Sequence, residues 1–124
     1  MAFIPVEGDI CELPGVGGYK FTASGLIYKG QAVTYTGDNT VGVPNNNNAR
    51  LLGVADVTVA AGNPICIYGP GNIVYCKLSG AQSAGTRVGI ISEGYIANSA
   101  DYSSQAVVVQ GTTATGDGKI LILG

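Results

Sequence analysis

The sequence contains no histidine and no tryptophan, and only six Lys or Arg and eight Asp or Glu residues occur among its 124 positions. Charged residues make up 11% of the chain, whereas soluble domains usually carry about 25%. The absence of histidine removes the commonest general base at neutral pH and the commonest zinc or copper ligand. We therefore expect that the protein is not an enzyme and that it has no catalytic residues, no cofactor and no metal site.

Basic residues are few and widely separated in the sequence. The net charge is −2, and the six basic residues are far apart in the sequence: Lys20, Lys29, Arg50, Lys77, Arg87 and Lys119. Proteins that bind nucleic acids need clustered Lys and Arg to replace the counterions around phosphates. We therefore expect no nucleic-acid partner.

Long apolar runs and export signals are also missing. No run approaches the roughly 18 consecutive apolar residues of a membrane helix, and Met1 to Pro5 lacks the basic start of a signal peptide. The three cysteines, Cys11, Cys66 and Cys76, form an odd number without C-x-x-C spacing, which is typical of reduced thiols. These features predict synthesis in the cytoplasm and no membrane partner.

What the chain does contain is a series of short β-branched runs separated by glycine-rich turns, with almost no helical periodicity. This pattern predicts a single all-β domain, a compact β-sandwich or small β-barrel, over residues 8–124. The expected strands are Gly8 to Glu12, Tyr19 to Thr22, Gln31 to Tyr35, Arg50 to Val59, Pro64 to Tyr68, Ile73 to Leu78, Thr86 to Ile91, Gly94 to Ala97, Ser104 to Gln110 and Lys119 to Leu123.

Turn residues that tolerate positive φ separate these runs. The expected turns are Thr36 to Asn39, Gly69 to Asn72, Ser92 to Gly94 and Gly116 to Gly118. The polar tract Asn45 to Asn48 is expected to be a solvated loop without function.

The first seven residues differ from the rest, because they are mainly apolar and contain Pro5. Residues 1–7 are predicted either as an extended N-terminal arm that docks on another surface or as an ordinary first edge strand.

Two groups of residues are candidates for a chemical site. Glu7, Asp9 and Glu12 are close in sequence, but Ile10 and Cys11 interrupt the alternating oxygen ligands that a calcium loop needs. Cys66 and Cys76 flank an expected turn, so a hairpin would bring them near each other. We expect reduced thiols that pack as small apolar side chains rather than a disulfide. Neither group predicts catalysis.

Seven tyrosines and only two phenylalanines supply the aromatic side chains. Tyrosine is enriched at interfaces because its ring is apolar and its hydroxyl bonds polar partners. Together with the low charge, this predicts a surface that is covered by other protein copies in the working state.

A series of short motifs follows one another along the chain: Glu7 to Ile10, Ala23 to Gly25 with Ile27, Lys29 to Val33, Leu52 to Ala55, Ala60 to Gly62, an expected hairpin from Pro64 to Leu78, Ala84 to Ile90 and Gly116 to Leu123. This order of motifs resembles the capsid decoration, or cement, proteins of tailed bacteriophages.

The resemblance implies a β-rich structural protein of the virion, often a homotrimer, that binds the exterior of the expanded capsid. It would stabilise the head by bridging subunits of the major capsid protein. If the N-terminal segment docks on the capsid, Phe3, Ile4 and Val6 are the residues expected to make that contact.

Three other functions remain open at this stage. A carbohydrate-binding β module on a virion or cell surface is the main alternative, although such modules usually present tryptophan. A small carboxylate-based hydrolase or lyase would depend on Glu7 and Asp9. A self-assembling component that forms its own lattice is the third.

Overall fold

The computed structural model describes residues 3–8, 10–13 and 19–123, and the regular elements in this part of the chain are β-strands apart from one 3₁₀ turn. The all-β prediction is confirmed. The elements are β1 (Cys11–Leu13), β2 (Tyr19–Ala23), β3 (Ala32–Gly37), β4 (Thr40–Gly42), β5 (Gly53–Ala55), β6 (Pro64–Tyr68), β7 (Ile73–Leu78), β8 (Arg87–Ile90), the 3₁₀ turn η1 (Ser92–Gly94), β9 (Ile96–Ala97), β10 (Ala106–Gln110) and β11 (Gly116–Ile122).

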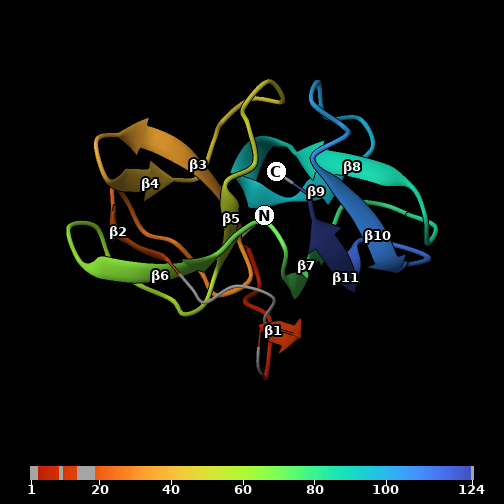
Figure 1. The fold of residues 1–124 in the computed structure, drawn as a ribbon, viewed down its shortest axis with the longest axis horizontal. Helices are drawn as coiled ribbons and strands as arrows, with labels where there is room; N and C mark the ends of the chain where they lie inside the picture. The colour runs from red at the N-terminus through yellow and green to blue at the C-terminus, as the bar shows by residue number, and fades with distance from the viewer. Residues whose placement is uncertain (1–2, 9, 14–18, 124) are drawn as a thin grey trace.

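The strands form two small barrels that lie side by side, at the left and right of Figure 1. The first barrel closes in the order β2-β4-β3-β5-β6, with β6 returning to pair with β2. The second runs β7-β11-β10-β8-β9 and closes through a parallel pairing of Leu78 with Ile96. β1 adds to β7 at the end away from that closure. Closure pairs the strand edges that an open sheet would leave free.

The paired strands β3 and β5 lie between the two hydrophobic cores. Successive residues of a strand point to opposite faces, and here both faces are buried. Val33 and Ala55 face the core of the first barrel, whereas Ala32 and Val54 belong to the cluster that fills the second. The β3–β5 pair is therefore a wall that both barrels share.

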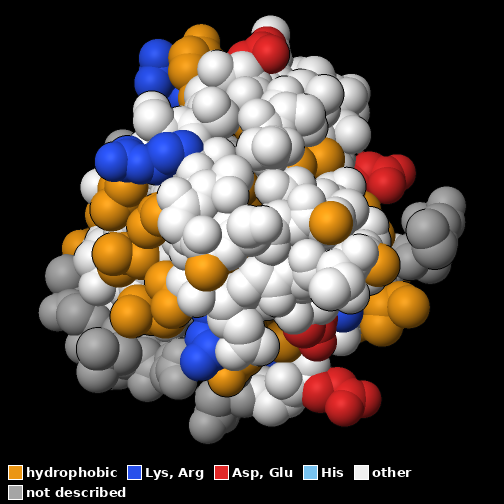
Figure 2. Space-filling view, turned by 90° about the vertical axis from the view of Figure 1, so that its right-hand side faces the viewer, with side chains coloured by type: hydrophobic (Ala, Val, Ile, Leu, Met, Phe, Trp, Pro, Cys, Tyr) orange, Lys and Arg blue, Asp and Glu red, His pale blue; other side chains and the backbone are white. Residues whose placement is uncertain are grey.

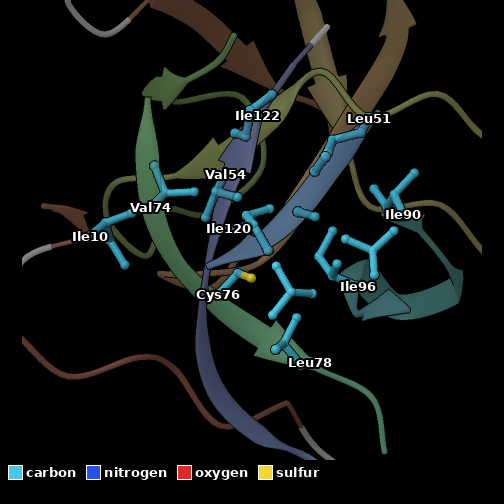
Figure 3. Close-up of a cluster of buried hydrophobic side chains, with 14 of the residues drawn as sticks. Ile10, Leu51, Val54, Val74, Cys76, Leu78, Ile90, Ile96, Ile120 and Ile122 are labelled. Carbon is cyan, nitrogen blue, oxygen red and sulfur yellow. The ribbon is translucent and has the colours of Figure 1, made fainter. Parts of the chain in front are cut away.

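The larger cluster is built mainly from alternating residues of the second barrel. Val74, Cys76 and Leu78 from β7 meet Ile120 and Ile122 from β11 (Figure 3). The burial of β7 alternates between half-buried and buried residues, as expected for strands with one face toward a core.

The β6–β7 region corrects one sequence expectation. The strands Pro64–Tyr68 and Ile73–Leu78 have the predicted bounds, but they do not pair with each other. The turn Gly69 to Asn72 carries the chain from one barrel into the other, and the buried Asn72 side chain holds it by donating to the Gly69 carbonyl at 3.0 Å. The expected hairpin is wrong, so Cys66 and Cys76 belong to different barrels and are both free thiols.

A second correction concerns Gly116 to Gly118, which was expected to be a turn. These residues form the start of β11 and pair with β7, with Gly118 opposite Cys76. An added Cβ at Gly118 would lie 2.6 Å from a backbone oxygen of β10. The glycine is needed for close packing between strands rather than for a change of direction.

The connection after β4 joins the barrels at the surface. Asn45 to Asn48 are exposed, as predicted. The carbonyl of Asn47 accepts from the amide of Asp101 at 2.9 Å, and its side-chain oxygen accepts from the amide of Ser92 at 3.2 Å. The tract thus links the first barrel to two segments around the second.

Candidate functional site

The described residues contain no cluster of three or more His, Cys, Asp or Glu that could hold a metal ion. In the same part of the chain, no helix has the length and apolar character to cross a membrane. Glu7 is exposed. The other two carboxylates of the candidate group, Asp9 and the side chain of Glu12, lie outside the described residues.

The three predicted capsid-contact residues have different surroundings. Phe3 is 8% exposed, and its ring stacks on Tyr28 at 6.1 Å between centroids and contacts the Tyr95 ring at 5.3 Å. Ile4 is 67% exposed. The contact role of these residues stays a prediction, but only Ile4 presents most of its side chain to solvent.

Val6 belongs to the larger buried cluster. Its amide donates to the Lys29 carbonyl at 3.0 Å, and its side chain fills the space beside Gly30. Gly30 has φ +85°, and an added Cβ there would lie 2.7 Å from the Cβ of Val6. Phe3 and Val6 thus hold the N-terminal segment against the rest of the chain on both sides of Ile4.

A hollow of about 280 Å³ lies beside this segment and is lined by Phe3, Leu26, Tyr28, Val43 and Pro44 among others. Leu26 is 54% exposed. Exposed aliphatic residues next to a concave apolar surface are typical of protein contacts.

A second apolar hollow of about 220 Å³ opens on the first barrel. Its lining includes Tyr19, Phe21, Tyr35, Leu52, Ile67 and Pro70. The rings of Phe21 and Tyr35 meet edge to face at 5.7 Å. Tyr19 and Tyr35 are 46% and 59% exposed. Tyr19 and Phe21 are two residues apart on β2, so strand geometry places their rings on the same face of the strand.

An adjoining hollow of about 250 Å³ shares Tyr35 and Leu52 with the first and is completed by Arg50, Leu51 and Gln105. The Arg50 guanidinium lies 4.1 Å above the ring of Tyr102, a favourable cation–π arrangement. Within the described residues, Arg50 has no ion pair. We call the two hollows together the Tyr35 surface. The sequence shows seven tyrosines, but which of them are exposed and which converge depends on strand pairings that the sequence does not reveal.

The two described thiols are packing groups rather than nucleophiles. Burial raises the pKa of Cys76, with a smaller contribution from the charge of Asp117. Partial burial also raises the pKa of Cys66, with a further effect from Asp56. A thiol with a raised pKa carries little thiolate at neutral pH and reacts slowly.

Charge is sparse on the face of the second barrel shown in Figure 2. Most of this surface belongs to neither charged nor hydrophobic side chains, and the blue and red groups are separate spots. Hydrophobic side chains gather toward the left of the view. The visible face has no basic patch of the kind that binds nucleic acids.

No protein-family model and no curated protein sequence matches the chain. Among solved structures, it is similar to the crystal structure of the N base of head fiber gp8.5 in bacteriophage phi29. The TM-score is 0.63 with 13% sequence identity, and the match covers 85% of this chain and 92% of that chain. At this identity the likeness shows that the two chains share a fold.

Proposed function

We propose that the protein is a structural component of a tailed-bacteriophage virion that binds the outer surface of the capsid and bridges subunits of the major capsid protein. The observation that carries this proposal is the fold shared with the base of a phage head fiber over most of both chains. The motif order that resembles capsid decoration proteins is an independent reason for the same function. Such a protein has no catalytic role.

The surface chemistry supports a role that depends on contacts. Large hydrophobic side chains are exposed on several parts of the described surface, including Ile4, Leu26, Tyr19 and Tyr35. A chain with 11% charged residues has few ionic groups to desolvate when such side chains are covered. On a capsid, many weak copies of one contact add to tight attachment.

Within this proposal, Ile4 is the capsid contact of the N-terminal segment, and Phe3 and Val6 position it. The proposed oligomeric form is a homotrimer. The protein would be synthesised in the host cytoplasm and would be located on the exterior of the virion. A closed ring of copies would present several Ile4 side chains to the lattice at once.

The test uses heads of the encoding phage that were assembled without this protein. Purified protein is added, and its occupancy is measured by co-sedimentation, while the temperature of DNA release reports head stability. We expect saturable binding and a higher release temperature. Absence of binding to expanded heads would overturn the proposal.

A matched pair of variants tests the contact residue. Ile4→Asp should lower occupancy, whereas Val109→Asp should not, because Val109 is 43% exposed on β10 and does not line the hollow beside the N-terminal segment. Equal binding by both variants would remove Ile4 from the contact.

One observation keeps the carbohydrate-binding alternative open. Tyr19 and Tyr35 are 46% and 59% exposed beside a concave surface, and sugars stack on exposed rings. Binding on a glycan array that is lost in Tyr35→Ala, together with no binding to heads, would favour this alternative.

A further inference from the structure

The Tyr35 surface is shaped for single side chains. Its two hollows measure about 220 and 250 Å³, each below the roughly 300–1,000 Å³ of sites that enclose cofactors or drug-sized ligands. They adjoin at Tyr35 and Leu52, which line both. Alternate side chains of an extended peptide point the same way about 7 Å apart, so two adjoining hollows fit one extended segment.

The first hollow selects for apolar groups. No charged residue lines it, and three aromatic rings do, from Tyr19, Phe21 and Tyr35. The edge-to-face contact of Phe21 with Tyr35 fixes the ring at the shared rim before anything binds. A rim that is already ordered avoids part of the entropy cost of association.

The second hollow selects for negative charge. Arg50 is its charged residue, and its guanidinium is held over Tyr102 with no carboxylate partner among the described residues. Stacking uses the face of a guanidinium and leaves the in-plane N–H groups for a carboxylate. The side-chain oxygen of Gln105 accepts from the amide of Leu51 at 2.7 Å, which holds this side chain at the wall of the hollow.

We propose that the Tyr35 surface binds an extended segment of the major capsid protein in which an apolar side chain enters the first hollow and a nearby Asp or Glu pairs with Arg50. This inference rests on the proposed function and names the partner segment. It adds a contact on the first barrel to the one made by Ile4, so each copy would attach at two places.

Head binding by four variants tests the chemistry. Tyr35→Ala and Arg50→Glu should each weaken binding by roughly tenfold or more, which corresponds to the loss of one central contact. Tyr35→Phe should retain most of the affinity because it keeps the ring. Val57→Ala is the control, since Val57 is 45% exposed and lines neither hollow. Thermal unfolding of each variant checks that the fold is intact.

A photo-crosslinking amino acid in place of Tyr35 identifies the occupant. On heads, mass spectrometry should find a crosslink to one capsid-protein segment that contains an apolar residue and a carboxylate close together. A synthetic peptide of that segment should bind the free protein, and changing its Asp or Glu to Lys should restore binding to Arg50→Glu.

The outcomes separate the two proposals. If the wild type does not bind heads, the proposed function fails and this inference fails with it. If the wild type binds and Tyr35→Ala binds equally, only the inference fails. A crosslink to a second copy of this chain, or none to the capsid protein, also overturns it.

Discussion

The N-terminal segment allows a sharp test, because neighbouring residues in it have opposite surroundings. Phe3 is 8% exposed between Tyr28 and Tyr95, whereas Ile4 is 67% exposed. A buried aromatic side chain removes about 150–250 Å² from water, and Phe→Ala in a core costs about 3–5 kcal/mol. We place Phe3→Ala at about 3 kcal/mol, the lower end, because its partners are half-buried.

Chemical and thermal unfolding measure this difference. For a domain of this length, a loss of about 3 kcal/mol lowers the Tm by roughly 12 °C. Ile4→Ala is the matched control and should change the free energy of unfolding by less than about 0.5 kcal/mol. A double-mutant cycle between Phe3 and Tyr95 should give a coupling of about 0.5–1.5 kcal/mol, the value expected for a ring pair in contact.

If Phe3→Ala and Ile4→Ala had equally small effects, the reasoning would be refuted. The segment would then contribute nothing to the stability of the free protein and would behave as the detached arm that the sequence allowed.

Three further substitutions test the interior. Burial keeps the Cys76 thiol protonated in the folded state, while the unfolded thiol ionises near its ordinary pKa of 9.0; stability therefore falls as pH rises above that value. Between pH 8 and pH 10, this thiol should lower the free energy of unfolding of the wild type by up to about 1.4 kcal/mol per pH unit, and Cys76→Ala should lack this decrease. Urea unfolding of both proteins at the two pH values measures it, and an equal change in stability for wild type and variant would contradict the explanation. Gln105→Leu should cost about 1–3 kcal/mol, because the buried amide of Leu51 loses its acceptor; an unchanged urea midpoint would show that the hydrogen bond is dispensable. Gly118→Ala should cost about 1–3 kcal/mol through overpacking, whereas Gly116→Ala, whose added Cβ would have its nearest neighbour at 3.8 Å, should be almost neutral in thermal unfolding; equal effects would remove the packing explanation.

Local patterns predicted the strands well where alternation is strong. Ile73–Leu78 has the expected bounds because every second residue enters the core. β4 was missed because Thr40–Gly42 is short and follows turn residues directly. Its pairing partners, β3 and β2, are needed to define it.

Pairing between strands was the part that the sequence could not supply. The residues Gly69 to Asn72 do reverse local direction, but the composition of a turn does not determine whether the following strand pairs with the preceding one. The same limit hid the Tyr35 surface, because Tyr35, Arg50 and Pro70 come from three separate segments. Phe3, Ile4 and Val6 could be named together from their apolar character. The difference between exposed Ile4 and the anchored Phe3 and Val6 depends on contacts with Tyr95 and Lys29, which are distant in the sequence.

The strand pair that separates the two cores also determines what the smallest foldable unit is. Cutting the chain within Gly69 to Asn72 would leave Ala32 and Val54 on the first fragment without the isoleucine-rich cluster that covers them, and the second fragment without the wall that closes its core. We therefore expect that neither half folds by itself. The two barrels would then unfold together in one cooperative transition, although each has the strand number of a small domain.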